Sequence, residues 1–288
     1  MTTTIDTDAD LVLDDPARER AIEELGAYLP AQARSGTAIE AVGIDVRFGG
    51  VHALRSASMT VEAGSFTGLI GPNGAGKSTL FDVINGFTKP GEGTVTLFDR
   101  DVTSAGAADR ARLGMSRTFQ ANHIDPLISV RDNLIAGGYL SIRGGVIAST
   151  LRLRTSWADE QRVARVADAV AQALHLDGVL HEAAGNLNFG AQRRVEIGRS
   201  LMSGPRVLLL DEPAAGVDAT EALSLMALIK DLQTRLGLTV VLIEHHVQSV
   251  LENCDAIYAL DQGSIIASGT PDHIATNDAV KSAYLGGA

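Results

Sequence analysis

A chain of 288 residues is long enough to bury a full hydrophobic core in one or two domains. Its formal net charge of −11 argues against a protein that chiefly holds nucleic acid, because such binding needs lysine and arginine at the phosphates. The single cysteine, Cys254, excludes an intramolecular disulfide and a cysteine-rich metal site, and favours a reducing compartment. The sequence shows neither a signal-peptide pattern nor the run of about 18 apolar residues that a membrane-spanning helix needs. We therefore expect a protein that stays in the cytosol unless a partner holds it at a membrane.

Residues 1 to about 38 differ in composition from the rest, with eight acidic residues against three arginines. This composition is typical of a partly disordered acidic extension. The alternative is one docked helix that starts at Asp15 and Pro16, because proline is tolerated at the first helical position. Such a helix would carry an apolar stripe made of Ile22, Leu25 and Leu29.

From residue 39 to 288 the pattern predicts a single α/β domain, because apolar strands alternate with helical segments. The strands have few polar residues, which indicates a largely parallel sheet that is buried on both faces. The stretch from about 121 to 203 is mainly helical and is expected to be an insert in this core. The expected strands are 39–48, 66–70, 94–98, 207–210 and 239–243, and the expected helices are 77–85, 157–176, 190–202 and 220–236.

A glycine-rich loop lies between the strand at 66–70 and the helix at 77–85. It reads Gly71-Pro72-Asn73-Gly74-Ala75-Gly76-Lys77-Ser78-Thr79 and fits the phosphate-binding loop G-x-x-x-x-G-K-[ST] in full. Its glycines let backbone N–H groups point at phosphate oxygens, and the helix N-terminus adds a partial positive charge. Lys77 is expected to pair with the β- and γ-phosphates of ATP, and the Ser78 hydroxyl to ligate Mg²⁺.

A second candidate segment is the apolar strand at 207–210, which ends in Asp211 and Glu212. An apolar strand that ends in two acids is usually followed only by a solvated turn. About 130 residues after a phosphate loop, however, the pair indicates a nucleotide site. Asp211 is expected to support Mg²⁺ through its water shell, and Glu212 to orient and deprotonate the attacking water.

Further motifs follow in chain order, and together they resemble the ATPase subunit of ABC (ATP-binding cassette) transporters over residues from about 39 to 285. The resemblance implies that Phe48 stacks on adenine and that Gln120, at the end of Ser116-Arg117-Thr118-Phe119-Gln120, senses Mg²⁺ and water. It implies that His245 is the switch residue that contacts the γ-phosphate. The fold it implies is that of the P-loop NTPases: a mostly parallel sheet core, an antiparallel β subdomain and a helical subdomain.

The family's signature is matched by Leu187-Asn188-Phe189-Gly190-Ala191 at the start of a helix, and its loop aspartate by Asp218. The resemblance implies that two ATPase subunits, identical or homologous, face each other head to tail, so that each signature completes the partner's ATP site. Hydrolysis would then open the dimer and drive integral membrane permease subunits. Nucleic acid is not an expected partner, and the expected location is the cytoplasmic face of the cell membrane.

Three residues depart from the commonest family pattern. Asn188 replaces a serine that reaches the γ-phosphate, and Ala191 replaces a glutamine. The Asn188 amide can still donate a hydrogen bond, but Ala191 cannot donate from its side chain. We therefore expect slower turnover or a partner subunit with the stronger signature. His246 stands where aspartate is more usual, which leaves open how the His245 ring is oriented.

Local features resemble the ATPases of importers for branched-chain amino acids and related compounds, which receive their cargo from an external solute-binding protein. They are the segments at 116–120, 211–216 and 243–245, the insert at 137–174 and the ending Ala283-Tyr284-Leu285-Gly286. Cargo itself is chosen by the partners, so urea, amides or other small carboxylates remain alternatives.

Other function classes fit the sequence less well. The related ATPase of lipopolysaccharide export usually lacks the Arg-Thr-Phe run before the glutamine. ABC ATPases of DNA repair or chromosome maintenance carry long coiled coils, and translation factors usually carry two cassettes; this chain has one cassette and a short insert. A binding module without hydrolysis would lack Glu212 or His245, and both are present.

Overall fold

The computed structural model describes residues 15–33, 35–118, 124–138 and 154–285. The chain forms two compact units, and each draws on segments that are far apart in the sequence. The sheet unit contains residues 32–117, 206–213 and 237–288, and the helical unit contains residues 1–31, 118–205 and 214–236. None of the described helices is long and apolar enough to cross a membrane.

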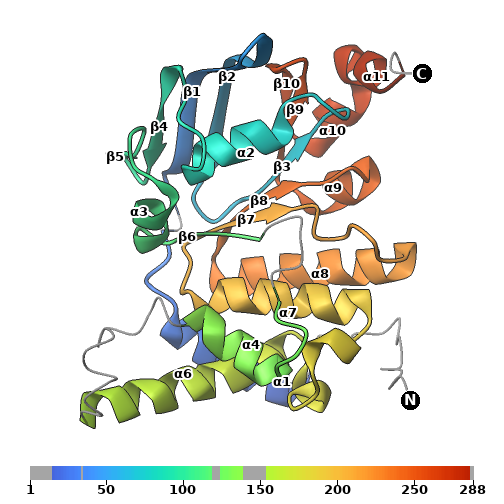
Figure 1. The fold of residues 1–288 in the computed structure, drawn as a ribbon. Coiled ribbons are helices and arrows are strands. Elements are labelled where there is room, and N and C mark those ends of the chain that lie inside the picture. Colours follow the sequence, from blue (N-terminus) through green and yellow to red (C-terminus); the bar gives the residue numbers. More distant parts are fainter. Residues whose placement is uncertain (1–14, 34, 119–123, 139–153, 286–288) are drawn as a thin grey trace. The chain divides into compact units, whose positions relative to one another are not determined.

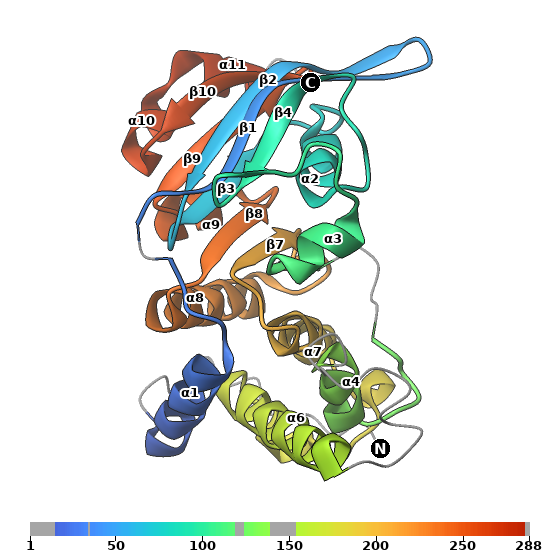
Figure 2. The same cartoon turned by 90° about the vertical axis from the view of Figure 1, so that its left-hand side faces the viewer.

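The sheet unit contains a six-stranded sheet and a four-stranded sheet, both visible in Figures 1 and 2. The larger sheet has the order β10-β9-β3-β8-β7-β6; its pairs are parallel except β9–β10. The smaller sheet, β2-β1-β4-β5, is antiparallel throughout. This confirms the expected parallel core with an antiparallel β subdomain. The strands are β1 Thr37–Phe48, β2 Val51–Glu62, β3 Phe66–Ile70, β4 Glu92–Leu97, β5 Arg100–Asp101, β6 Met115–Arg117, β7 Val207–Asp211, β8 Thr239–Ile243, β9 Ala256–Asp261 and β10 Ser264–Gly269.

The central strands β3, β7 and β8 are buried at every position, which explains their continuous apolar sequence. The helix that follows the phosphate loop, α2, packs its apolar side into the same core through Leu80, Phe81 and Ile84. The helices of this unit are α2 Lys77–Asn85, α3 Ala107–Arg112, α9 Val247–Asn253, α10 Pro271–Thr276 and α11 Asp278–Leu285.

The C-terminal end of α2 is held by Arg110, whose side chain is almost completely buried. Its Nη1 donates to the carbonyls of Val83 and Ile84 at 2.7 and 2.6 Å. Its other nitrogens donate to the carbonyls of Val102 at 2.7 Å and Ala105 at 3.1 Å. A cation is favourable at this point because the last carbonyls of a helix lack partners and carry partial negative charge. Arg110 thus fixes one end of the helix whose other end carries the phosphate loop.

The helical unit contains five described α-helices and two short 3-10 turns. The helix expected at Asp15 is present: Asp15 caps it through a hydrogen bond from the backbone N–H of Ala17, and Pro16 is its first residue. For residues 16–28 the structure favours the docked-helix alternative, because Ile22, Leu25 and Leu29 are all buried. Residues 1–14 lie outside the described residues. The helices are α1 Pro16–Tyr28, α4 Val130–Gly137, α6 Arg154–Ala173, α7 Phe189–Met202 and α8 Ala219–Leu236.

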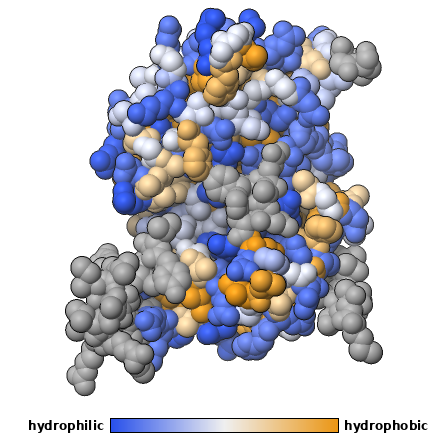
Figure 3. All heavy atoms as spheres, viewed as in Figure 1, coloured by the Kyte–Doolittle hydropathy of each residue, from blue (hydrophilic) through white to orange (hydrophobic). Residues whose placement is uncertain are grey.

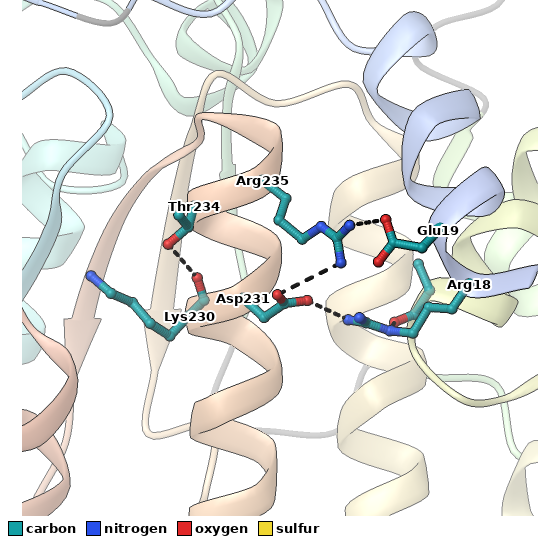
Figure 4. A network of polar contacts seen from close by, with 7 residues as sticks. Arg18, Glu19, Lys230, Asp231, Thr234 and Arg235 are labelled. Carbon is teal, nitrogen blue, oxygen red and sulfur yellow. Dashed lines mark hydrogen bonds and ion pairs between the residues drawn. The ribbon is translucent and has the colours of Figure 1, made fainter. Parts of the chain in front are cut away.

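Arg18 of α1 is the centre of a polar network that joins three helices (Figure 4). Its side chain is fully buried; Nε donates to the carbonyl of Ala173, the last residue of α6, at 3.1 Å. Its Nη2 donates to Asp231 of α8 at 2.6 Å, and the neighbouring Glu19 pairs with Arg235 of α8. One buried guanidinium therefore satisfies the end of α6 and also binds α8.

The other end of α1 makes a similar contact. The Tyr28 hydroxyl donates to the carbonyl of Met202, the last residue of α7, at 2.6 Å, and Arg162 of α6 lies over the Tyr28 ring. Helix α1 therefore reaches the carboxyl ends of both α6 and α7.

Replacing Arg18 by methionine is expected to lower the free energy of unfolding by about 1–3 kcal/mol, because the Ala173 carbonyl loses its buried donor. Asp231 retains some exposure, so water can replace part of its lost partner. Urea denaturation followed by circular dichroism measures the change. Arg20→Met, on the exposed side of the same helix, is the matched control and is expected to be neutral. Equal stability of the two variants would contradict the role given to Arg18.

On the face shown in Figure 3, hydrophilic residues predominate and apolar residues occur in small groups. Among the described residues, the exposed large apolar side chains include Phe48, Phe189 and Leu223. Two of the eight such side chains among these residues, Phe48 and Phe189, lie in the motifs expected to hold nucleotide or to face a second subunit.

Candidate functional site

The phosphate loop runs from the end of β3 to the start of α2, as its sequence predicts, and two of its glycines are required by the backbone. Gly71 has φ +154°, and a Cβ there would lie 2.1 Å from the carbonyl oxygen of Leu260. Gly76 precedes α2 with φ +106°, and a Cβ there would lie 2.7 Å from the carbonyl oxygen of Ala53. No other residue fits these positions without displacing backbone.

Lys77, the first residue of α2, turns its side chain back across the loop. The Nζ atom donates to the carbonyls of Gly71 at 2.8 Å and Pro72 at 3.1 Å, and the residue is only 6% exposed. Burial lowers the pKa of Lys77, and the charges of Glu212 and Asp211 oppose that shift. The Lys77 ammonium group is thus held at the loop by neutral carbonyls and by the charges of two nearby carboxylates. An anion bound at the loop would pair well with this ammonium group.

The other loop residues are also placed where a phosphate could reach them. Asn73, Gly74 and Ser78 are exposed, whereas Ala75 is buried and its N–H donates to the carbonyl of Pro72. Thr79 follows in the first turn of α2 and is half-buried. The hydroxyl of Ser78 therefore lies at an open helix N-terminus, which is a favourable site for anions.

The two carboxylates at the end of β7 lie in different environments. Asp211 is 3% exposed, and its Oδ2 accepts a hydrogen bond from Nη2 of Arg117 at 2.7 Å. Burial raises the pKa of Asp211, and the hydrogen bond and charge of Arg117 oppose the rise. Glu212 has φ +50°, a left-handed conformation that costs about 1–3 kcal/mol outside glycine and is concentrated at functional sites.

Glu212 is paired with His245. The His245 Nε2 lies 2.6 Å from the Glu212 Oε1, and the Glu212 side chain is mostly buried, whereas nearly half of the His245 side chain is exposed. The pairing follows from the sheet, because β7 and β8 are parallel neighbours and Asp211 is in register with Ile243. A carboxylate and an imidazole at this distance can share and transfer a proton.

The contacts of His246 and Glu244 show how His245 is held. The Nδ1 of His246 lies 2.9 Å from the Ser249 hydroxyl in the first turn of α9, so its described contact is with α9. Glu244 is buried and accepts a hydrogen bond from the backbone N–H of His245 at 3.1 Å. The His245 backbone is thus held by Glu244, and its ring by Glu212.

Phe48 lies at the end of β1, and 53% of its surface is exposed. Just before it, Asp45 accepts a hydrogen bond from His52 at 2.7 Å and lies 3.6 Å from Arg47. The hydrogen bond to His52 is the largest cause of a lowered pKa of Asp45. An exposed ring on a strand end that is tied down in this way is suited to stacking on a base.

The signature segment lies in the helical unit and starts α7. Asn188 is the N-cap: its Oδ1 accepts a hydrogen bond from the backbone N–H of Ala191 at 2.8 Å. Its amide nitrogen remains a donor, and Phe189 beside it is 63% exposed. Leu187 and Ala191 are buried, and Ala191 has no exposed surface. The methyl group of Ala191 is therefore covered within its own unit, and the effect of the missing donor on turnover stays a prediction.

Two smaller elements complete this part of the helical unit. Gly190 is buried, and a Cβ there would lie 1.8 Å from the Glu221 carboxylate of α8, so α7 approaches α8 closely. Asp218 accepts hydrogen bonds from the backbone N–H groups of Thr220 and Glu221, both at 2.9 Å. Asp218 therefore holds the start of α8, a role that its sequence position did not reveal.

The sequence-predicted residues thus fall into the two units. The sheet unit holds Phe48, the phosphate loop, Asp211, Glu212 and His245, and the helical unit holds 187–190 and Asp218. Gln120 lies outside the described residues, and its role stays a prediction. Sequence reasoning missed Arg117 as a partner of Asp211, because β6 is too short to be detected from the sequence.

The donor chemistry of the sheet unit suits Mg²⁺, a hard cation that takes oxygen ligands and usually keeps several waters. Ser78 supplies a hydroxyl and Asp211 a carboxylate. Among the described residues there is no cluster of three or more His, Cys, Asp or Glu side chains that could hold a metal ion. Phosphate oxygens and waters are the ligands that Mg²⁺ usually takes beside one or two protein oxygens.

Comparison with known proteins gives two family matches. Residues 54–215 match the family model described as ABC transporter. Residues 264–288 match the model described as branched-chain amino acid ATP-binding cassette transporter.

Individual relatives extend these matches to most of the chain. The high-affinity branched-chain amino acid transport ATP-binding protein LivG of Salmonella typhimurium is 37% identical over 247 residues, covering 85% of this chain and 96% of the relative. The lipopolysaccharide export system ATP-binding protein LptB of Escherichia coli is 35% identical, covering 82% and 92%. The crystal structure of the ADP conformation of MJ1267, an ATP-binding cassette of an ABC transporter, superposes with a TM-score of 0.75 at 32% identity, covering 88% and 100%.

Proposed function

We propose a transport role for this chain, which belongs to the ABC transporter family of ATP-binding proteins. As a member it binds nucleotide and hydrolyses ATP. The proposal is that this ATPase powers uptake of branched-chain amino acids, or a related small solute, through membrane permease partners. The observation that carries it is the 37% identity to LivG across 96% of that protein.

The geometry supports a division of roles within the sheet unit. Lys77 and the backbone of the phosphate loop bind the phosphates, and Phe48 stacks on the adenine. Ser78 and Asp211 would hold Mg²⁺, which would neutralise the charge that develops on the phosphates. Glu212 orients the attacking water and takes up its proton, while His245 keeps the Glu212 carboxylate in place and reaches the γ-phosphate.

The other wall of each ATP site is supplied by a second ATPase subunit, identical or homologous. The Asn188 amide and the Phe189 ring are exposed at the start of α7. These are the groups that would face the partner's nucleotide. Binding of ATP then joins two subunits and hydrolysis releases them. Permease subunits hold the dimer at the cytoplasmic face of the membrane and receive solute from an external binding protein.

Import is favoured over export by the carboxyl end of the chain. Residues 264–288 match the branched-chain amino acid model, and this segment includes β10, α10 and α11. Lipopolysaccharide export is the second candidate, because the identity to LptB is only slightly lower than that to LivG. The catalytic geometry fits import and export equally, so the identity of the permease partner distinguishes the two functions.

Co-expression with candidate permease subunits, followed by purification in detergent and reconstitution into liposomes, tests the proposal. Uptake of radiolabelled leucine that depends on ATP and on the external binding protein is the expected result. A complex that carries Lys77→Ala is the control, since it lacks the ammonium group that is proposed to pair with the phosphates. Association with a lipopolysaccharide-exporting permease, or ATP-dependent transport of other solutes without leucine uptake, would overturn the cargo assignment.

A further inference from the structure

Arg117 lies at the point where the chain leaves the sheet unit. It is the last residue of β6, an edge strand of three residues that pairs only with β7 in the six-stranded sheet. The chain division places Arg117 in the sheet unit and Thr118 in the helical unit. A three-residue edge strand has few ladder hydrogen bonds, so its side chains matter for holding its end in place.

The Arg117 guanidinium joins this strand end to both nucleotide-binding elements. Its Nη1 donates to Oδ1 of Asp82 in α2 at 2.5 Å, and its Nη2 donates to Oδ2 of Asp211 at 2.7 Å. The side chain is only 6% exposed and lies over the Phe81 ring, 5.6 Å from its centroid. Arg117 therefore connects the phosphate-loop helix, the carboxylate at the end of β7 and the end of β6.

The two partners differ in exposure, and this sets what Arg117 does to each. The Asp211 side chain is 3% exposed, so its charge depends on a nearby cation, whereas the Asp82 side chain is 39% exposed and reaches water. Arginine can donate to two carboxylates at once through separate nitrogens in a rigid plane, which the point charge of lysine cannot reproduce. Asp82 and Phe81 hold the guanidinium on two sides, and the guanidinium in turn holds one oxygen of the Asp211 carboxylate.

We propose that Arg117 is a positioning residue that orients Asp211 toward the magnesium ion of Mg·ATP. The inference rests on the proposed role of Asp211 in supporting the metal. Groups that orient a metal-supporting carboxylate typically change metal affinity about 10–100-fold when they are removed. The bare nucleotide, in contrast, is held by the phosphate loop, whereas Asp82 and Asp211, which accept hydrogen bonds from Arg117, lie outside that loop.

The test is the Mg²⁺ dependence of ATP binding in the full-length chain, measured by titration with and without EDTA. Arg117→Met is expected to raise the Mg²⁺ concentration for half-maximal binding about tenfold, while the affinity for ATP in EDTA stays within about twofold of the wild type. Arg117→Lys is expected to recover part of the loss, because one charge remains near Asp211. The matched control is Arg112→Met on α3, which removes an exposed arginine whose described partner is Asp109.

Asp82→Asn is a second variant that tests the inference if Arg117→Met fails to fold. It removes the charge of the more exposed partner and leaves the Arg117–Asp211 pair intact. It is expected to raise the Mg²⁺ requirement less than Arg117→Met does. Unchanged Mg²⁺ dependence in Arg117→Met, or an equal loss of affinity with and without Mg²⁺, would overturn the inference. Asp211→Asn separates the two proposals: if it leaves Mg²⁺ dependence unchanged, the role of Asp211 itself fails, whereas a loss there without a loss in Arg117→Met rejects only the role of Arg117.

Discussion

Replacing Glu212 by glutamine is expected to leave ATP binding intact and to lower the rate of hydrolysis by about 10²–10⁴-fold, the usual contribution of a positioned general base. Glutamine has the same size and can still form a hydrogen bond to the His245 ring, 2.6 Å from the carboxylate it replaces. It also meets the same left-handed backbone at φ +50°, so a difference in strain does not complicate the comparison. What changes is the ability to accept a proton from water.

Steady-state ATPase assays of the assembled complex and nucleotide titrations of the variant measure the two quantities separately. Glu92→Gln, an exposed position on β4, is the control for the loss of a negative charge and is expected to behave as the wild type. Normal turnover in Glu212→Gln would show that another group is the base. A loss of ATP binding would instead show that Glu212 shapes the phosphate site.

Replacing Asn188 by aspartate is expected to lower ATPase activity of the assembled complex by about a hundredfold or more, while thermal stability stays close to that of the wild type. Aspartate caps a helix as well as asparagine does, so the bond from the Ala191 N–H is kept. Its negative charge, however, would face the γ-phosphate of the nucleotide held by the second subunit. Like charges brought together at an interface cost several kcal/mol, and each 1.4 kcal/mol corresponds to about tenfold.

Two further variants at this position separate capping from nucleotide contact. Asn188→Ser keeps a cap and restores the commoner signature residue, and we expect it to raise turnover. Asn188→Ala loses the cap and is expected to cost about 1 kcal/mol of stability. If aspartate and serine variants hydrolyse ATP equally fast, position 188 does not face the nucleotide of a second subunit.

The sequence predicts best what depends on local pattern. The helix 77–85 and the strand 239–243 have the same bounds in the structure, because a glycine loop and a continuous apolar run mark their ends. The position of the phosphate loop is likewise predicted from a local sequence pattern. Asn188 as a helix N-cap could also be anticipated, since asparagine is among the preferred residues there.

Other features depend on residues that are distant in the chain. The pairing of Glu212 with His245 requires β7 and β8 to be neighbours, which the sequence does not state. Strand β6 is three residues long and has no periodicity to detect, so the contacts of Arg117 could not be foreseen. The burial of Arg18 depends on partners in α6 and α8, and composition alone favoured a mobile acidic segment.

The docking of α1 also has a consequence for the order in which the chain folds. Arg18 contacts residues that lie 155 and 213 positions later in the sequence, so its partners do not exist when α1 is synthesised. At typical rates of translation the interval to Asp231 is roughly 10–40 s. Until α6 has been synthesised, the apolar side of α1, formed by Ile22, Leu25 and Leu29, lacks the helix against which it packs in the native unit. The helical unit is therefore completed late, when α1 docks on α6 and α8. A chaperone that shields the apolar side of α1 during synthesis would protect this docking step.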